Sequence, residues 1–463
     1  MHYKTLSQVS TQLAEGEVSS VELTEAMLQR IASLNSTYNA YVQVFEEEAR
    51  AAAIRADQMA QQKGRSGPLH GVPVAVKDLF DVAGTPTGCA STIRQDHIAS
   101  KNATVVEKLQ AAGAIILGKT NMTEFALSGY HPDLPVPLNP WNKDRWAGVS
   151  SSGSGVATAL GMSYATLGSD TGGSIRFPSA ANGVTGIKPT FGTVSKHGAF
   201  PLSFTLDHVG PITRSVEDAA TVLQAIAGFD SADPFSIEGS PPDFLANMKM
   251  GIDGLKIGLD RSFCTTNVDP DVTTAVLKAA EQLESLGATL VEVDVMPVLE
   301  TAQFWGVVVA AEAALVHKET FPSQKEQYGP VFRDLLELAP NLRATDYAAA
   351  REASARAQMT FNMAFSKSDL LLCPGAPAPA MPLSEFGPTT VLPAEAVASF
   401  TGLTAPMNFT GLPTISVPCG FSTEHLPIGL QFVGPYHSEP TLIQAAYAYE
   451  QSTQWHQEVP PIP

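Results

Sequence analysis

Cysteine is scarce in this chain of 463 residues, which has four thiols, at Cys89, Cys264, Cys373 and Cys419. They lie far apart and form no C-x-x-C pair, so the sequence predicts no disulfide framework. No H-E-x-x-H motif and no cluster of Cys and His is present, and we expect neither a metal nor a cofactor. Dispersed thiols in a chain of this length favour a reducing compartment.

Positive charge is also in short supply, because 28 Lys and Arg residues stand against 46 Asp and Glu residues, for a net charge of −18. A broad phosphate-binding surface needs clustered Lys and Arg, so we expect no nucleic-acid partner. The N-terminal segment lacks the apolar stretch of a signal peptide, and no run of 18 or more apolar residues exists. We therefore expect a cytoplasmic protein without membrane contact.

Repeats, low-complexity tracts and clear linkers are absent, and a hydrophobic content of 44% is enough for a large core. Hydrophobic periodicity and turn residues predict the elements of the first half: helices over 5–63, a strand over 72–76, a helix over 102–112, a strand over 114–118, mostly loops over 183–211 and a helix over 215–226. In the second half they predict strands over 255–259 and 289–295 flanking an amphipathic helix, mainly helices over 300–365, a strand over 369–373, a Pro-rich loop over 374–393, strands over 414–417 and 428–433, and a helix over 441–450. The order strand, helix, strand at 72–118 indicates a parallel sheet with crossovers.

Residues 148–174, GVSSSGSGVATALGMSYATLGSDTGGS, place serines among glycines at both ends of a small-residue segment. Small residues let backbones approach a reacting group, and a Gly-Gly pair lets successive N–H groups point in one direction. This pattern predicts a serine nucleophile in the second cluster, Ser174, activated from the first. Backbone N–H groups between Thr171 and Ser174 would then stabilise an oxyanion. The serine run over 150–154 also fits a flexible, helix-capping turn.

Lys77 ends the apolar run VPVAV. Most lysines are solvated surface charges, but a lysine at the end of a buried strand loses hydration, which lowers its pKa. The neutral amine can then act as a general base near pH 7. A Ser-His-Asp triad built from His197, His208 and Asp207 stays open, because spacing neither supports nor excludes it.

Other known motifs for nucleophiles and phosphate binding are absent or incomplete in this sequence. The pattern G-x-S-x-G is not met at Ser174, because Arg176 stands where the last Gly would be, and no S-x-x-K is present. The dinucleotide fingerprint is incomplete after Gly153-Ser154-Gly155, and no G-K-[ST] follows a Gly-rich loop.

Taken together, several segments resemble the amidase signature family: GVPVAVKDLFDVAGTPTGCAS (71–91), AIILGKTNMTEF (114–125), the Ser-Gly stretch, GSDTGGSIRFPSAANGVTGIKPTFGTVS (168–195) and DHVGPITRSVEDAA (207–220). The resemblance is dense over 68–220, returns at 411–419 and 427–434, and is loose over 225–400. It implies an α/β fold, an α/β/α sandwich around a large twisted mixed sheet, in a single amidase domain over 1–463. We expect N-terminal helices over 1–66, the signature core over 67–220, a variable, mainly helical insert over 225–400, and C-terminal strands and a helix over 401–463.

The resemblance also assigns roles. The family's Ser–cis-Ser–Lys triad falls on Lys77 as base, Ser150 as relay after a cis peptide bond, and Ser174 as nucleophile. Val149 and Ser152 depart from the family pattern, in which Gly is common, without removing a catalytic hydroxyl. The implied oxyanion donors are the N–H groups of Thr171, Gly172, Gly173 and Ser174.

Asp170, Ser154 and Arg176 are expected to hold these loops by hydrogen bonds, although ordinary polar roles stay open. Candidate substrate contacts also suit core or surface positions; they are Ala126, Tyr130 and Ser150, with Phe204, Trp305 and the 374–393 loop as further candidates.

The implied function is hydrolysis of a linear carboxamide or an aryl or alkyl amide to a carboxylate plus ammonia or an amine. The partner is then a small-molecule amide, and a homodimer stays open. A carbamate or urea-type hydrolase, acting on urethane or allophanate-like substrates, is the nearest alternative because it uses the same acyl chemistry. The A subunit of a glutamine-dependent aminoacyl-tRNA amidotransferase is another, although the segment 128–140 and the negative charge disfavour it. Retention of the full triad disfavours a catalytically inactive binding protein.

Overall fold

The computed structural model describes residues 1–385 and 390–462. Within these residues, eleven strands form one sheet in the order β1-β3-β2-β4-β6-β5-β10-β11-β9-β7-β8. The strands are β1 (Tyr41–Val44), β2 (Pro73–Lys77), β3 (Ile115–Thr120), β4 (Ala165–Asp170), β5 (Thr185–Lys188), β6 (His208–Thr213), β7 (Lys256–Leu259), β8 (Thr289–Glu292), β9 (Leu370–Pro374), β10 (Thr414–Phe421) and β11 (Pro427–Val433).

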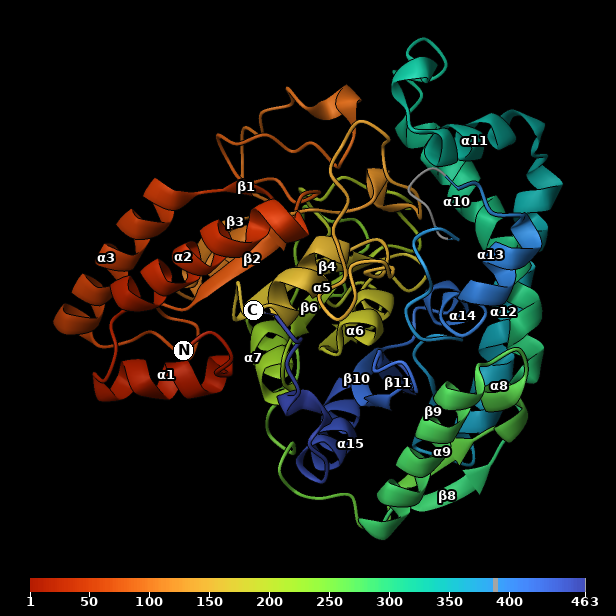
Figure 1. The fold of residues 1–463 in the computed structure, drawn as a ribbon. Coiled ribbons are helices and arrows are strands. Elements are labelled where there is room, and N and C mark those ends of the chain that lie inside the picture. Colours follow the sequence, from red (N-terminus) through yellow and green to blue (C-terminus); the bar gives the residue numbers. More distant parts are fainter. Residues whose placement is uncertain (386–389, 463) are drawn as a thin grey trace.

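The sheet is the middle layer of an α/β/α sandwich, as the sequence predicted, with α1–α3 gathered on one side of the molecule and α10–α14 on the other (Figure 1). The α-helices are α1 (Leu6–Glu15), α2 (Ser20–Tyr38), α3 (Glu46–Lys63), α4 (Thr104–Ala111), α5 (Ser152–Ala159), α6 (Arg176–Asn182), α7 (Val216–Ile226), α8 (Arg261–Thr265), α9 (Pro270–Ser285), α10 (Ala302–Val316), α11 (Pro330–Leu338), α12 (Ala344–Phe365), α13 (Ala394–Thr401), α14 (Ala405–Phe409) and α15 (Glu439–Gln451). Short 3-10 helices are η1 (Thr92–Arg94), η2 (Glu124–Ala126), η3 (Met296–Thr301), η4 (Lys325–Gln327), η5 (Ala339–Asn341) and η6 (Trp455–Gln457).

The sheet is mixed. β2 pairs in parallel with both β3 and β4, and β7 pairs in parallel with β8 and β9, whereas the other neighbouring strands are antiparallel. α4 connects β2 to β3, so the parallel crossover predicted for 72–118 is confirmed. A capping box forms at the start of α2, where Ser19 and Glu22 hydrogen-bond reciprocally.

Four strands lie where the sequence did not predict them. β1 interrupts the region predicted as helices over 5–63, β4 lies inside the Ser-Gly stretch, and β5 and the first residues of β6 lie in the region predicted as loops over 183–211. β4 and β5 are buried along their whole length. β4 consists largely of Gly, Ala, Ser, Thr and Asp, and β5 has only four residues, which include Gly and Lys. They therefore show neither the alternation of a half-buried strand nor strong β propensity, which explains why they were missed.

The loosely matching region over 225–400 is not only helical. It supplies β7, β8 and β9, which form one edge of the common sheet beside β11. The predicted Pro-rich loop over 374–393 lies partly outside the described residues. The assignment of the chain to a single domain stays a prediction.

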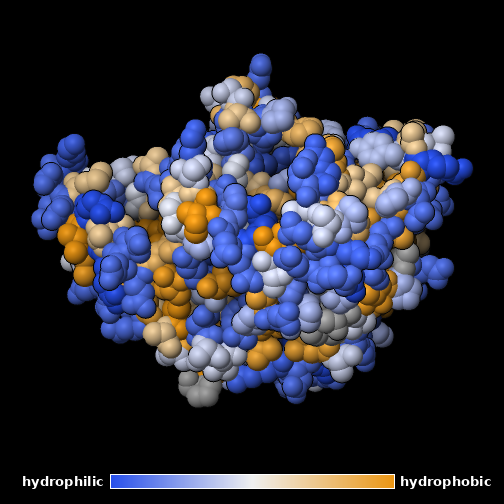
Figure 2. Space-filling model, turned by 90° about the horizontal axis from the view of Figure 1, so that it is seen from above, coloured by the Kyte–Doolittle hydropathy of each residue, from blue (hydrophilic) through white to orange (hydrophobic). Residues whose placement is uncertain are grey.

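One segment of the described residues, Met296–Val316, is long and apolar enough to cross a membrane by length and composition alone. Half of its most apolar window is buried inside the fold, and core helices of soluble proteins meet the same criterion. On the face seen in Figure 2, hydrophobic residues form small patches among hydrophilic ones. The cytoplasmic location stays a prediction.

The centre of the sheet brings two sequence-distant chain segments together. β2 and β4 run in parallel, with Val76 paired to Leu167, so their carboxyl ends reach the same edge. Lys77 is the last residue of β2, and Asp170 is the last residue of β4. Functional residues of α/β proteins commonly lie at such an edge.

Candidate active site

Lys77 is fully buried at the end of β2. Its Nζ is hydrogen-bonded to Oγ of Ser150 at 2.7 Å and to Oγ of Ser169 at 2.9 Å. Burial lowers the pKa of Lys77 to about 7, and the nearby carboxyl groups of Asp207 and Asp170 act in the opposite direction. The apolar run before Lys77 predicted both the burial and the direction of this pKa shift.

Ser150 precedes α5, and the peptide bond between Val149 and Ser150 is cis. Gly148, just before it, has a φ of 81°. A Cβ atom at Gly148 would lie 2.4 Å from Cα of Pro178, so only glycine fits this close approach.

The interpretation of the serine run as a flexible, helix-capping turn is wrong. All four serines of this run are fully buried: Ser150, Ser151, Ser152 and Ser154. The residue at the N-cap of α5, Ser151, makes no capping hydrogen bond with its side chain. The run is therefore a packed part of the core beside Lys77.

Ser174 lies in the turn between β4 and α6 and is 9% exposed. Its carbonyl oxygen accepts a hydrogen bond from the N–H of Ser151 at 3.3 Å. Within the described residues, the hydroxyl of Ser174 makes no hydrogen bond, to Ser150 or to any other group. The structure thus brings Lys77 and Ser150 into direct contact and places Ser174 beside them through the backbone of Ser151.

A buried ion pair supports the turn that carries Ser174. The guanidinium of Arg176 donates to both carboxylate oxygens of Asp170, at 2.9 and 3.0 Å, and neither side chain is exposed. Burial alone would raise the pKa of Asp170, but the charge and hydrogen bonds of Arg176 hold that pKa well below its usual range. Asn408 joins the pair by donating to Asp170 Oδ1 at 2.9 Å and accepting from Arg176 at 2.7 Å.

Ser154, the third predicted supporting residue, ties α5 to the sheet. Its hydroxyl lies 2.7 Å from Oγ1 of Thr120 on β3 and donates to the carbonyl of Leu167 on β4 at 3.1 Å. These contacts join a helix to two strands, and the loop-holding role expected for Ser154 stays a prediction.

The predicted oxyanion donors differ in whether their N–H groups are free to bind a substrate oxygen. The N–H of Gly173 donates to Oδ1 of Asp170 at 2.8 Å, which corrects its assignment as a free donor. The N–H groups of Thr171, Gly172 and Ser174 donate no hydrogen bond within the described residues. The carbonyls of Thr171 and Gly172 accept from Trp305 Nε1 at 2.9 Å and from the Thr404 hydroxyl at 2.5 Å, which fixes the orientation of these peptide groups.

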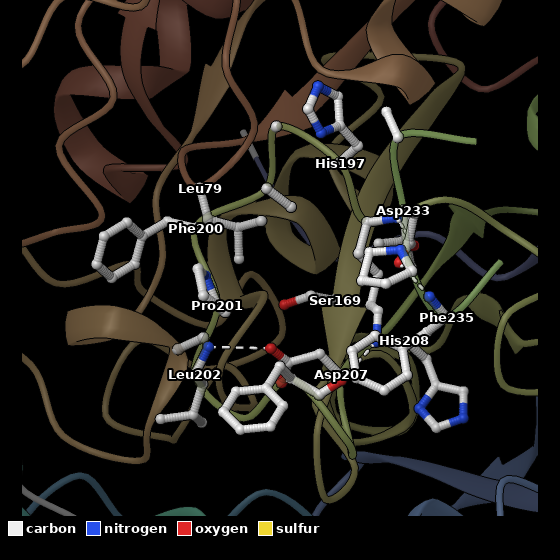
Figure 3. A pocket seen from close by; sticks show the side chains of 18 residues that line it. Leu79, Ser169, His197, Phe200, Pro201, Leu202, Asp207, His208, Asp233 and Phe235 are labelled. Atoms are coloured by element: carbon white, nitrogen blue, oxygen red, sulfur yellow. Dashed lines mark hydrogen bonds between the residues drawn. The ribbon is translucent and has the colours of Figure 1, made fainter. Parts of the chain in front are cut away.

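Two cavities flank this cluster. The Ser174 cavity has a volume of about 50 Å³ and is lined by Ala126, Leu127, Ser128, Val149, Gly172, Ser174, Phe177, Trp305, Leu392, Val397, Phe400 and Thr401. The Ser169 cavity has a volume of about 290 Å³; its lining includes Leu79, Ala126, Ser169, Phe200, Leu202, Phe204 and Asp207, most of them drawn in Figure 3. Ala126 lines both, and it has the left-handed φ of 63°. Tyr130 and Ser150, the other predicted substrate contacts, are buried and line neither cavity.

The structure excludes the alternative Ser-His-Asp triad. Asp207 accepts from the Thr171 hydroxyl at 2.6 Å and from the N–H groups of Leu202 and Ser203. Within the described residues, neither His197 nor His208 hydrogen-bonds to this carboxylate. His208 instead places Nδ1 2.7 Å from the carbonyl of Leu206.

Ser169 and Asn408 are polar partners that the sequence analysis missed. Ser169 stands in the motif GSDTGGS, where its only sequence signal was proximity to Asp170. Asn408 lies 238 residues from Asp170 and offered no signal. Within residues 1–385 and 390–462, no group of three or more His, Cys, Asp or Glu side chains could hold a metal.

A central mixed sheet with a buried lysine, buried serines and adjoining cavities at the carboxyl edge of parallel strands defines an α/β enzyme. The chain belongs to the amidase family, whose family model matches residues 22–443. The resemblance to amidase signature proteins is thus confirmed, and the protein is a hydrolase of carbon–nitrogen bonds other than peptide bonds.

Relatives match the chain from end to end. An amidase of Pseudomonas putida is 41% identical over 463 residues, covering 99% of this chain and 98% of the relative. The A subunit of the glutamyl-tRNA(Gln) amidotransferase of Azotobacter vinelandii is 39% identical over 490 residues, covering 99% of each. A crystal structure of an amidase superposes with a TM-score of 0.86 at 33% identity, covering 97% of this chain and 99% of the other. Amidases and amidotransferase A subunits thus both match nearly the whole chain, at 41% and 39% identity in these two relatives.

Proposed function

We propose that the protein hydrolyses a linear carboxamide or an aryl or alkyl amide to a carboxylate plus ammonia or an amine, through an acyl-enzyme on Ser174. The observation that carries this proposal is the contact of 2.7 Å between Nζ of Lys77 and Oγ of Ser150. Because burial brings the pKa of Lys77 to about 7, a large fraction of the amine is neutral near pH 7 and can accept a proton.

In the proposed mechanism, neutral Lys77 takes the proton of Ser150, and Ser150 takes the proton of Ser174. Oγ of Ser174 forms a bond to the carbonyl carbon, and the N–H groups of Thr171, Gly172 and Ser174 stabilise the oxyanion. The relay returns a proton to the nitrogen as the carbon–nitrogen bond breaks. Water then attacks the ester, which releases the carboxylate and regenerates Ser174. Catalytic hydrogen bonds often tighten only with substrate present, which is consistent with a Ser174 hydroxyl that does not yet contact Ser150.

The lining of the Ser174 cavity supports an uncharged acyl group. Its described side chains are mainly aliphatic and aromatic, and none of them carries a charge. Glutamine, the substrate of the amidotransferase alternative, bears an α-ammonium and an α-carboxylate, and burying those charges without partners is costly. The net charge of −18 also disfavours a tRNA partner. A carbamate or urea-type substrate is the second candidate, because an uncharged carbamoyl group suits the same lining.

Ser174→Ala and Lys77→Ala should each lower kcat/KM for an anilide by at least about a thousandfold, because each removes a reacting group from the relay. Release of the aromatic amine, followed by absorbance, measures this. Ser262→Ala, which changes an exposed serine on α8, is the control and should retain full activity. Activity within tenfold of the wild type in either site variant would overturn the mechanism.

A panel with one acyl group presented as anilide, primary amide, ester and carbamate, together with glutamine, separates the alternatives. We expect the purified chain alone to hydrolyse amides and to leave glutamine intact. Intact-mass spectrometry should detect an acyl adduct in the wild type that is absent from Ser174→Ala.

A further inference from the structure

Ser169 is the second hydroxyl in contact with Lys77. It lies on β4, is 4% exposed, and its Oγ accepts a hydrogen bond from Nζ of Lys77 at 2.9 Å. Figure 3 shows this hydroxyl directed into the Ser169 cavity. Among the described residues, that cavity shares only Ala126 with the lining of the Ser174 cavity. The mechanism proposed above uses Ser150 and Ser174 and gives Ser169 no role.

The backbone of Ser169 is fixed from two directions. Its register in the sheet sets it opposite Val209 on β6. Its N–H donates to Oγ of Ser151 at 3.3 Å, and Oγ of Ser151 donates to its carbonyl at 3.2 Å. The position of the Ser169 side chain is therefore set by its place in the sheet and not by Lys77, and Ser151 adds only two longer hydrogen bonds to the same backbone.

The chemistry of a neutral amine explains what such a contact does. A neutral amine has two N–H donors and one lone pair, and rotation about the Cε–Nζ bond decides where the lone pair points. An N–H donated to Ser169 turns the lone pair toward the other neighbour, Ser150, whose proton it must accept. With Ser150 as the only neighbour, the amine could instead donate to Oγ of Ser150, which does not remove its proton.

We propose that Ser169 is a positioning residue for Lys77, whose hydroxyl orients the amine so that its lone pair faces Ser150. The proposal rests on the function proposed above, in which Lys77 is the base. Ser169 acts through Lys77, because it does not line the Ser174 cavity where the acyl group would lie.

None of the charged and titratable groups that face Lys77 hydrogen-bonds to its Nζ within the described residues, so a serine hydroxyl must orient the amine. These groups are Asp207, Asp170 and Cys89. Asp207 is engaged by Thr171, Leu202 and Ser203, and Asp170 is engaged by Arg176. Within the described residues, the two serine hydroxyls are the only groups hydrogen-bonded to Nζ of Lys77. Removing the Ser169 hydroxyl therefore changes the orientation of the amine and leaves these charges in place.

Ser169→Ala should lower kcat for the anilide about tenfold and leave KM unchanged, because one hydrogen bond that acts on the base is lost. The acidic limb of the pH–kcat profile should also move to lower pH. A hydroxyl acceptor stabilises the ammonium more than the amine, so its loss favours the neutral form.

Ser169→Thr keeps the hydroxyl and should restore both kcat and the acidic limb, since the added methyl group has room in the Ser169 cavity. Ser169→Cys keeps the size but weakens the acceptor, and should shift both readouts in the direction of Ser169→Ala. It tests the proposal if the alanine variant fails to fold.

Ser151→Ala is the matched control. It removes a buried hydroxyl whose hydrogen bonds, among the described residues, go only to the backbone of Ser169. Because pairing with β6 still holds that backbone, the acidic limb should stay where it is in the wild type. If Ser169→Ala or Ser169→Cys leaves both kcat and the acidic limb unchanged while Ser174→Ala is inactive, the positioning role is wrong. The proposed function would still hold in that case. Equal losses in Ser151→Ala and Ser169→Ala without a shift of the limb would also overturn the positioning role. Activity in Ser174→Ala would instead contradict the proposed function itself.

Discussion

The burial of Lys77 lowers the free energy of unfolding of the protein. Burial lowers its pKa from the usual lysine range to about 7, so between these values the unfolded chain binds more protons than the folded one. The free energy of unfolding contributed by this group therefore rises with pH above 7, and at neutral pH most of the cost remains. A fully buried amine is retained in spite of this cost, which is typical of a group kept for function.

Lys77→Met should raise the melting temperature at pH 7 by a few degrees, because a similar volume is kept and the charge is removed. It should also abolish amide turnover. Differential scanning calorimetry at pH 6, 7 and 9 measures the first effect, and the gain should shrink toward pH 9. A lower melting temperature at every pH would contradict the account of Lys77 as a destabilising buried amine.

The sequence identified the proposed reacting groups better than their neighbours. Lys77 was found from the apolar run before it and Ser174 from the Gly-Gly pair before it, while Ser150 was assigned by likeness to a family motif. Asn408 and Trp305 join the site from more than a hundred residues away. Such contacts depend on how α10 and α14 dock against the turn, and no local pattern encodes that. The hydrogen bond from the Gly173 N–H to Asp170 could not be predicted for a different reason. A Gly-Gly pair indicates that N–H groups are accessible, but it does not indicate which group accepts from them.

The turn between β4 and α6 is the element on which the site depends. Its geometry is set by Asp170, which accepts from the N–H groups of Gly173 and Ile175 while it pairs with Arg176. Gly172 is also required there, because a Cβ atom would lie 2.8 Å from the indole of Trp305. Peptide groups held this way need little reorganisation when charge develops on a substrate oxygen.

Asp170→Asn should destabilise the protein by about 3–5 kcal/mol, because it leaves the Arg176 guanidinium buried without its counter-charge. Urea unfolding followed by circular dichroism measures this change. Turnover should fall together with stability, since the turn loses its anchor. The control is Glu352→Gln on α12, whose ion pair with Arg356 is more than half exposed on both sides and should matter by less than about 1 kcal/mol. A change in Asp170→Asn no larger than that of the control would show that the amide replaces the carboxylate.

At the scale of elements, prediction succeeded where a pattern was strong. The apolar run over 72–76 gave β2, and hydrophobic periodicity gave the helices α2 and α3 within 5–63. β4 and β5 were not predicted, because α5, α6 and α7 cover both of their faces. Small residues are enough to pack such strands, and hydrophobic and polar residues do not alternate along them. Two inner strands of the sheet were thus missed, and one of them, β4, leads into the turn that carries Ser174.

At the scale of the whole molecule, buried carboxyl groups link the N-terminal helix α1 and the C-terminal helix α15 to α7. Asp218 on α7 accepts from the N–H groups of Leu6 and Ser7 at the start of α1, and Glu450 on α15 accepts from the N–H of Val216 on α7. Burial raises the pKa of Asp218 to about 6 and that of Glu450 to about 8. Burial likewise raises the pKa of Glu124 to about 7 and that of Asp207 to about 6.

These raised values set the pH dependence of global stability. An acid whose pKa is raised by folding stabilises the folded state fully below its unfolded pKa, and this contribution is lost as pH rises through the folded pKa. The four groups therefore weaken the fold between about pH 4.5 and 8, and the net charge of −18 adds self-repulsion over the same range. Buried bases whose pKa values are lowered by burial act oppositely, among them His317, His208, Lys188 and Lys77. We expect the carboxyl groups and the net charge to outweigh these bases, so that the melting temperature falls between about pH 5 and pH 8.5.

Glu450→Gln tests which groups cause that fall. The amide oxygen can still accept from Val216, but the side chain cannot ionise, so the variant should gain stability at about pH 8.5 and little at about pH 5. Its curve of melting temperature against pH should be flatter than that of the wild type, with no change in activity because α15 lies outside both cavities. A parallel curve displaced by the same amount at every pH would assign the decline to net charge instead of to Glu450.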